Sequence, residues 1–503
     1  MDDSSGSTEF SEQTQQLPQM RKEEQYEIHD SAITSDPYET SEVEDQPPDS
    51  EWMISIKKKL EQARQDEVDC SRGAVCIYRV PHYLREGDET AYLPQVVSLG
   101  PFHHGNERVR QMDRHKWRAL HRVLERTKHD IKLYLDAVKE LEDRARNCYE
   151  GSITLSSNEF VEMMVLDGCF VTELLQGVVQ GFRQLGYLPN DPIFAMRGSI
   201  HAIQRDMIML ENQLPLCILN RLLELQTGER AEAGFASTLI LHFLNPLIHA
   251  DEPLEETDCE KPESLKPDEM TFDPLSYDGG LHCLHVFRRS LLRRGSEPEH
   301  RIWMEKWSDG NSVIKDRRSQ QLVHCVTELR EAGIKFKKRS TNRFWDITFK
   351  NGTLHIPKLL IHNGTKSLFL NLIAFEQCHP DCGNKITSYA VFMDNLINSQ
   401  QDVAYLHYCG IIEHWLGSDA EVADLFNGLC QEVIFERRYS YLSRLSKKVN
   451  RYYNRRWHTW RATLNRKYFS SPWSFISFVA AVIFLLLSFL QTFYGAYSYY
   501  NRR

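Results

Sequence analysis

A short motif with two thiols, Cys378-His-Pro-Asp-Cys382, comes nearest in this sequence to a metal-binding pattern. Thiolate sulfur and imidazole nitrogen are ligands that zinc prefers, so the motif could supply half of a zinc site. A complete site needs a second pair of ligands, and the next candidates, His407 and Cys409, lie 25 or more residues further on. We therefore favour a turn with two incidental thiols over half of a zinc site, and we predict no metal and no cofactor.

The adjacent histidines His103 and His104 follow a Gly-Pro turn. Imidazole changes its charge near neutral pH, so two histidines on one loop could do acid–base work. Histidines more often pack or form local hydrogen bonds, and we favour that interpretation.

Four acids stand in otherwise apolar helical patterns: Asp167, Asp206, Glu211 and Glu376. A buried carboxylate needs a partner, such as Arg197 or Arg205, or its pKa rises. Two carboxylates in different surroundings can act as a catalytic pair, whereas a structural polar network or a helix cap needs only hydrogen bonds. We favour the structural role and assign no catalytic residue. An enzyme of unknown class that uses these acids with the two histidines is the alternative.

Common nucleotide-binding and catalytic motifs are absent from the sequence. It contains no Gly-x-Gly-x-x-Gly or Walker-type loop, no Gly-x-Ser-x-Gly elbow and no His-Glu-x-x-His pair. Its 503 residues are 41% hydrophobic and 26% charged, which excludes a wholly disordered, collagen-like or multi-span membrane protein. Its 12 cysteines are too sparse for a small disulfide-stapled scaffold.

An apolar run occupies residues 473–494, near the end of the chain. As a helix it would extend about 33 Å, enough to cross the hydrocarbon core of a bilayer. Aromatic residues flank the run, as they do at membrane interfaces. We therefore favour a single transmembrane helix over residues 472–495, rather than a buried core helix. We assign to the span Trp473, Phe478, Ile483, Leu486, Leu490 and Tyr494.

A strongly basic stretch precedes this run, because residues 437–467 contain 11 lysines and arginines and no acid. Only Arg502 and Arg503 follow it, so the positive-inside rule predicts a cytoplasmic body and a short tail, 496–503, across the membrane. We predict that residues 437–471 form a basic amphipathic helix against anionic headgroups. A solvated helix face or a nucleic-acid surface is the less favoured interpretation. We assign to the membrane surface Arg451, Arg455, Arg456, Arg461, Arg466 and Lys467.

Two acidic segments differ from the rest of the chain. Residues 1–50 carry 14 acids against Arg21 and Lys22, and they lack the features of a signal peptide. Residues 251–274 carry 10 acids and four prolines. Neither segment has enough apolar surface to offset the entropy of ordering, so both are predicted to be disordered. We expect the globular body to span residues 51–436, and the arginine-rich stretch 288–318 to be a surface segment.

Apolar residues recur at helical spacing through most of the body. The pattern predicts helices over 52–68, 112–141, 157–175, 200–225, 239–248, 320–332, 385–398, 402–416 and 442–464. Pro215 predicts a break near Gln213. Ser418 and Glu421 fit a capping box that begins a further helix.

Alternating apolar residues on both sides of Asn351-Gly352 predict a β-hairpin of residues 344–349 and 353–361. Pro357 predicts that the second arm is an edge strand. No alternation of strands and helices indicates a parallel sheet. The predicted fold class is therefore mainly α with a small β-hairpin element (α+β), followed by a single C-terminal transmembrane helix.

The cysteines lie mostly among apolar neighbours, which is typical of small core residues in a reducing compartment. Asn351 and Asn363 each begin an Asn-Gly-Thr sequence, which matches the acceptor for N-glycosylation. A cytoplasmic body predicts that both stay unmodified. We favour the plasma membrane over the endoplasmic reticulum.

A series of short motifs occurs between residues 75 and 495. They include Cys-Ile-Tyr-Arg-Val-Pro (76–81), Val-Ser-Leu-Gly-Pro-Phe-His-His-Gly (97–105), Leu-Asp-Gly-Cys-Phe (166–170), Leu-Glu-Asn-Gln-Leu-Pro (210–215), Asn-Leu-Ile-Ala-Phe-Glu-Gln-Cys (371–378) and Pro-Trp (472–473). In this order the motifs resemble the plant "domain of unknown function 247" family, a group of uncharacterised plant membrane proteins. The resemblance implies a plant protein with one C-terminal span and no established catalytic residue. Some grass members are linked to self-incompatibility, where they resemble pollen-side recognition determinants.

These observations together predict a membrane-anchored plant protein that acts as an interaction, recognition or signalling module. We expect two kinds of partner: membrane lipid, through the span and its basic flank, and a protein of unknown identity. We expect no nucleic acid. A reversed orientation, with the body outside the cell, is a further alternative that the basic flank argues against.

Overall fold

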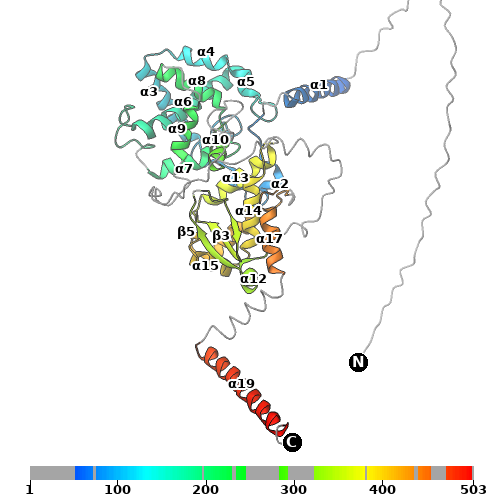
Figure 1. The fold of residues 1–503 in the computed structure, drawn as a ribbon. Helices are drawn as coiled ribbons and strands as arrows, with labels where there is room; N and C mark the ends of the chain where they lie inside the picture. Colours follow the sequence, from blue (N-terminus) through cyan, green and yellow to red (C-terminus); the bar gives the residue numbers. More distant parts are fainter. Residues whose placement is uncertain are drawn as a thin grey trace, which may run out of the picture. The chain divides into compact units, whose positions relative to one another are not determined.

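The computed structural model describes residues 51–71, 75–194, 197–228, 234–244, 282–292, 322–341, 343–379, 382–435, 440–454 and 472–500 (Figure 1). The segments predicted to be disordered, 1–50 and 251–274, lie outside these residues. Helix α1 (Glu51–Ser71) confirms the helix expected over 52–68. The rest of the described chain forms mainly helices with two small sheets, which confirms the predicted fold class.

The first half of the body surrounds α6 (Ser157–Gln180), which begins with a capping box of Ser156 and Glu159. Most side chains of α6 are buried, because it packs against α3 (Asp113–Thr127), α4 (Ile131–Lys139), α8 (Leu216–Thr227) and α9 (Phe235–Leu244). The other elements of this half are α2 (His82–Arg85), η1 (Glu89–Tyr92), η2 (Arg110–Met112), α5 (Glu142–Arg146), α7 (Arg197–Met207) and α10 (Cys283–Leu291).

Two of the predicted helices are divided. The stripe over 112–141 forms α3 and α4, because Lys128 adopts a left-handed conformation with φ of 59° and Asp130 caps α4. The prediction of one long helix is therefore wrong. The apolar residues of both helices pack into the same core, so their spacing alone did not reveal the break. The break predicted at Pro215 is confirmed: α7 ends at Met207, and Pro215 is the N-cap of α8.

The second half of the body contains both sheets. In the first, the strand order is β1 (Lys335–Arg339), β3 (Thr353–Pro357), β2 (Thr348–Lys350). In the second, β4 (Leu359–Ile361) pairs with β5 (Ile412–His414). The helices of this half are α12 (Val326–Glu331), α13 (Thr365–Cys378), α14 (Lys385–Leu396), α15 (Gln400–Tyr408), α16 (Asp419–Leu429) and α17 (Ser443–Tyr453).

The predicted hairpin is confirmed in β2 and β3, which pair antiparallel around Asn351 and Gly352, both at positive φ (49° and 74°). The expectation that Pro357 marks an edge strand is wrong. Strand β3 is central, and it tolerates Pro357 as its last residue. Parallel pairing was also missed: β1 pairs parallel with β3, and β4 reaches its parallel partner β5 through α13, α14 and α15.

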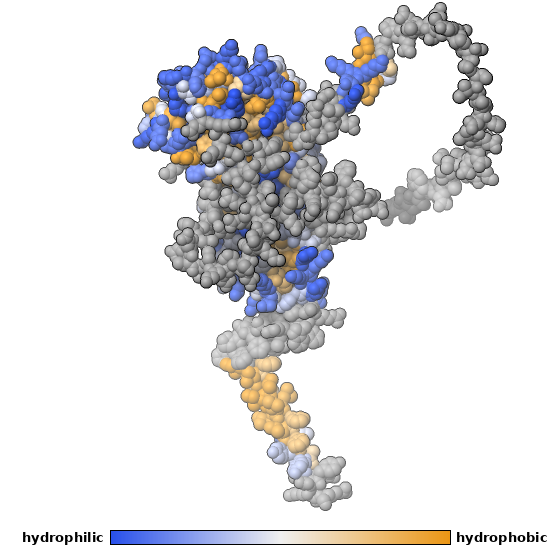
Figure 2. Space-filling model, turned by 45° about the horizontal axis from the view of Figure 1, so that its top comes forward, coloured by the Kyte–Doolittle hydropathy of each residue, from blue (hydrophilic) through white to orange (hydrophobic). Residues whose placement is uncertain are grey.

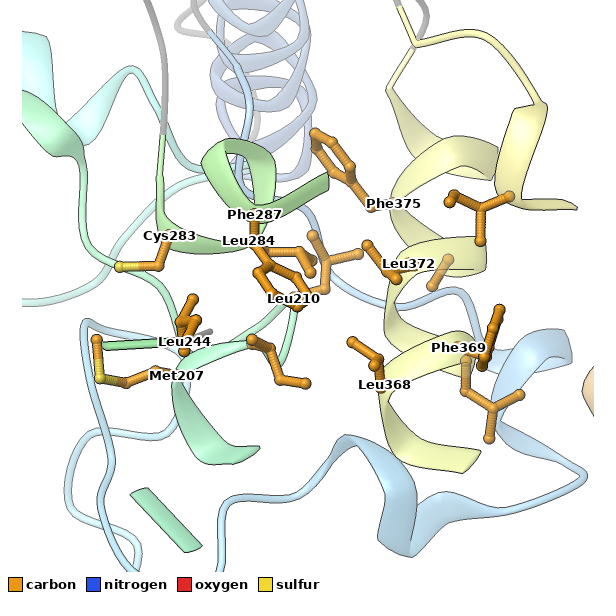
Figure 3. Packing of buried hydrophobic residues seen from close by; sticks show 14 of the residues in the cluster. Met207, Leu210, Leu244, Cys283, Leu284, Phe287, Leu368, Phe369, Leu372 and Phe375 are labelled. Carbon is orange, nitrogen blue, oxygen red and sulfur yellow. The ribbon is translucent and has the colours of Figure 1, made fainter. Parts of the chain in front are cut away.

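Helices α10 and α13 connect the two halves through a continuous apolar core. Leu284 and Phe287 of α10 face Leu372 and Phe375 of α13 (Figure 3). Arg288 of α10 is only 2% exposed. The prediction of a surface segment is therefore wrong for residues 288–292, while 293–318 lie outside the described residues.

The C-terminal part is described in two helices. Helix α17 buries Ser446 and Val449, its N-cap residue Leu442 is also buried, and the helix contacts β2. Helix α19 (Pro472–Tyr500) contains the apolar segment Ile476–Tyr497, none of which is buried. Figure 2 shows the almost continuous hydrophobic surface of α19.

Candidate functional site

The buried carboxylate of Asp206 binds the backbone of the 95–97 segment. It accepts hydrogen bonds from the N–H groups of Gln95, Val96 and Val97 at 2.6 to 3.1 Å. The predicted partner Arg205 lies further away, with Nη2 3.8 Å from Oδ1 of Asp206. Burial raises the pKa of Asp206, and the three backbone donors oppose this shift. The arrangement anchors a loop that lacks regular hydrogen bonding of its own.

Asn212 and Asp167 continue this anchoring along the same loop. Asn212 accepts from the N–H of Leu99 at 2.6 Å, and Asp167 accepts from the N–H of Gly100 at 2.9 Å. Lys116 lies 2.6 Å from the other oxygen of Asp167. Burial raises the pKa of Asp167, while the Lys116 ammonium opposes the rise. Asp167 and Asp206 therefore bind consecutive parts of one loop.

Glu211 is the acid that lies nearest to a candidate histidine. Its Oε1 accepts from the N–H of Val80 at 2.7 Å and from the Arg85 guanidinium, while its Oε2 lies 3.5 Å from Nε2 of His103. Burial lowers the pKa of His103, so the imidazole is neutral near pH 7. His104 is exposed and does not share this site. The predicted histidine pair is thus divided between interior and surface.

Glu376 completes the set of predicted acids. It pairs with Arg288 and also accepts from the N–H groups of Ile386 and Thr387 at 3.1 and 2.8 Å. Arg288 was not recognised as its partner, because the two residues are separated by 88 positions. Each of the four acids therefore has described hydrogen-bond donors, which supports the structural role favoured from the sequence.

The cysteine motif has a neighbour that was not foreseen. His379 and Cys382 lie beside His285 of α10, and the ligand atoms of the three side chains are all within 4.8 Å of one another. Neither Cys378 nor the expected candidates His407 and Cys409 belong to this group. The spacing of His282 and His285, one helical turn apart, is a signal in the sequence that could have indicated the missing ligand.

The membrane residues are only partly described. Phe478, Ile483, Leu486, Leu490 and Tyr494 are exposed along α19, and Trp473 lies in its first turn. Arg451 is exposed on α17. The remaining assigned basic residues, Arg455, Arg456, Arg461, Arg466 and Lys467, lie outside the described residues. Within the part of the chain that the structure describes, α19 is the helix long and apolar enough to cross a membrane.

Comparison with known proteins identifies a family. The DUF247 family, described as "Plant protein of unknown function", matches residues 77–487. The UPF0481 protein At3g47200 of Arabidopsis thaliana is 33% identical over 446 residues, which cover 85% of this chain and 87% of that protein. A second Arabidopsis thaliana UPF0481 protein, At3g02645, is 25% identical over 520 residues, which cover 90% of this chain and 96% of that protein. No solved structure matches the chain. The chain therefore belongs to the plant DUF247 family, as its motifs predicted.

Proposed function

We propose that this protein is a membrane-anchored interaction module, whose helical body binds a protein partner on the cytoplasmic side of the plasma membrane. The observation that carries the proposal is α19, whose apolar segment Ile476–Tyr497 is long enough to cross a bilayer and is not buried against other parts of the protein. A fully exposed apolar helix of this length is unfavourable in water, so a lipid environment explains it best.

The basic flank supports the proposed orientation. Helix α17 buries one face and presents Arg444, Lys447, Lys448 and Arg451 on the other. Residues 437–467 contain no acid that would neutralise this charge. Each cation close to an anionic leaflet contributes about 1 kcal/mol of attraction, and the positive-inside rule places such a flank in the cytoplasm.

The contacts of the buried acids favour interaction over catalysis. Asp206 and Asp167 bind loop backbone, and Glu376 accepts hydrogen bonds from Arg288, Ile386 and Thr387. Glu211 is the exception with a histidine at 3.5 Å, but its other oxygen is already held by Arg85. Some grass members of the family that the motifs resemble are linked to recognition in self-incompatibility, and the proposed partner is a protein.

Membrane topology tests the proposal directly. Asn351 lies in the hairpin turn and Asn363 follows β4, and both are exposed. Either side chain would be accessible to glycosylation if the body entered the secretory lumen. The full chain is expressed in plant cells with an N-terminal tag, and endoglycosidase sensitivity is measured beside protease protection of the tag.

We expect membrane-bound protein without glycans, and a tag that is digested only after the plasma membrane is permeabilised. A matched control carries a new acceptor sequence in the 496–503 tail, which lies across the membrane in the proposed orientation. Endoglycosidase-sensitive mass at Asn351 or Asn363 would show that the orientation is the reverse of the one proposed. Recovery of the full chain in the soluble fraction would contradict the proposed membrane anchor.

A further inference from the structure

His285, His379 and Cys382 form a cluster of metal-ligand side chains at the junction of the two halves of the body. Their ligand atoms lie within 4.8 Å of one another, and His285 and Cys382 are buried. In a tetrahedral zinc site, bond lengths of about 2.0 to 2.3 Å place the ligand atoms roughly 3.4 to 3.8 Å apart. The observed cluster therefore needs only a small contraction to enclose an ion. Cys382 is not part of a disulfide, and zinc binds cysteine through the thiolate sulfur.

His285 supplies an independent indication of a ligand. It is 6% exposed, and its Nδ1 is buried without a hydrogen-bond partner among the described residues. Buried polar atoms are nearly always paired, and an unpaired one calls for an explanation such as a bound ion.

Tyr78 sets the tautomer of the second histidine. The Tyr78 hydroxyl donates its only proton to the carbonyl of Val75 at 2.8 Å. Its oxygen also lies 2.9 Å from Nδ1 of His379. Because the hydroxyl proton is already used, we assign the proton of this second contact to His379 Nδ1, which then donates to Tyr78. This tautomer keeps the lone pair on Nε2, as in metal sites where an outer hydrogen bond orients a histidine ligand.

Neighbouring side chains hold the cluster in place. The ring of His379 stacks on Phe375 with centroids 5.1 Å apart, and the ring of His285 lies 5.0 Å from the same Phe375. One turn along α10 from His285, Arg288 is neutralised by Glu376, which limits the positive charge beside the cluster. His282 is engaged elsewhere, because its ring nitrogens lie 3.0 Å from Gln213 Oε1 and 3.0 Å from the carbonyl of Cys76.

We propose that His285, His379 and Cys382 bind one Zn²⁺ ion, which joins α10 to the segment that follows α13. Two imidazoles and a thiolate suit zinc, whereas calcium and magnesium require oxygen ligands. Water is sufficient as the fourth ligand of a tetrahedral ion. This site goes beyond the proposed interaction function: it fixes the two halves of the body to each other, whatever partner the body binds.

Metal analysis of the full-length chain in detergent tests this site. The protein is purified without chelator, and its zinc content is measured by inductively coupled plasma mass spectrometry. We expect about one zinc per chain in the wild type, and a background level in His285→Gln and Cys382→Ser. The matched controls are Cys409→Ser and His407→Gln. His407 belongs to a second group with His414 and Asp419, so its variant tests whether zinc binds there instead.

A cobalt titration keeps the proposal testable if a ligand variant fails to fold. Adding Co²⁺ to metal-free wild-type protein should produce a thiolate-to-cobalt charge-transfer band, and the band should be absent from Cys382→Ser. Tyr78→Phe leaves all three ligands in place and should weaken zinc binding by about 10- to 100-fold. A wild type with neither stoichiometric zinc nor the cobalt band would overturn the proposal. Loss of zinc from His407→Gln alone would overturn it as well.

Discussion

Arg288 donates both Nε and Nη2 to the same carboxylate oxygen of Glu376, at 2.9 and 2.7 Å, where solvent hardly reaches either side chain. The guanidinium also donates to the carbonyl of Gly383 at 2.9 Å, and the second oxygen of Glu376 accepts from the Thr387 hydroxyl at 2.7 Å. The pair therefore connects α10, α13 and the start of α14. It lies close to the His285, His379 and Cys382 cluster. The ion pair and the cluster therefore both connect elements at the same junction.

Replacing Glu376 should reveal the energetic cost of a buried cation that lacks a counter-charge. Glu376→Gln keeps the shape of the side chain but removes the charge opposite Arg288. We expect the free energy of unfolding to fall by about 3–5 kcal/mol, measured by chemical denaturation of the detergent-solubilised chain. Glu125→Gln is the control, because its partner Arg122 is on the surface and the change should stay within about 1 kcal/mol. Equal effects of the two substitutions would contradict the assigned role.

Asp206→Asn separates a structural acid from a catalytic one. The amide keeps one acceptor oxygen for three backbone N–H groups, so we expect a loss of about 1–3 kcal/mol for each donor left unpaired. Thermal unfolding of the variant should occur at a lower temperature, while Asp136→Asn on the exposed face of α4 should behave like the wild type. A variant that folds normally but loses its cellular role would instead support catalysis.

Asp394 on α14 predicts a dependence of stability on pH. Burial raises the pKa of Asp394 to about 6. A raised carboxyl pKa means that the folded chain holds the proton more tightly than the unfolded chain, whose pKa is about 3.9. Stability is therefore lost as pH rises from about 4 through 6. Asp394→Asn should melt several degrees higher than the wild type at pH 7.5, and this advantage should shrink toward pH 4. The exposed Asp424 supplies the control substitution, Asp424→Asn, which should leave the pH profile unchanged.

The basic face of α17 should respond to the charge of the lipid. In nanodiscs that contain phosphatidylserine, hydrogen–deuterium exchange over residues 443–453 should be slower than in neutral lipid. Changing Arg444, Lys447, Lys448 and Arg451 to Gln should abolish this difference, because each cation contributes about 1 kcal/mol near the surface. A charge-matched control changes four exposed cations of the first half to Gln: Arg108, Arg110, Lys132 and Arg183. Loss of the lipid effect in that control would argue against contact through α17.

Local signals in the sequence were sufficient for several elements. The turn at Asn351-Gly352, the helix break at Pro215 and the long apolar helix near the C-terminus depend on residues close together in the chain, and each was found where it was expected. Strand order was not predictable in the same way. Strands β4 and β5 are three residues each, too short for a clear period-two pattern, and their pairing depends on the path of three intervening helices.

The sequence by itself determined the family, the mainly helical class and the segment suited to a membrane. Composition, periodicity and motif order can be read from the order of residues without knowing which residues are in contact. The tertiary structure alone decided what the polar residues of the interior do. Asp206 binds a segment more than 100 positions away, and Arg288 and Glu376 meet across 88 positions. His285 likewise joins a motif that had seemed incomplete. A buried charged or polar group needs hydrogen-bonding or charged partners, because it has lost its contact with water. Packing between elements that are distant in the chain decides which partners it has.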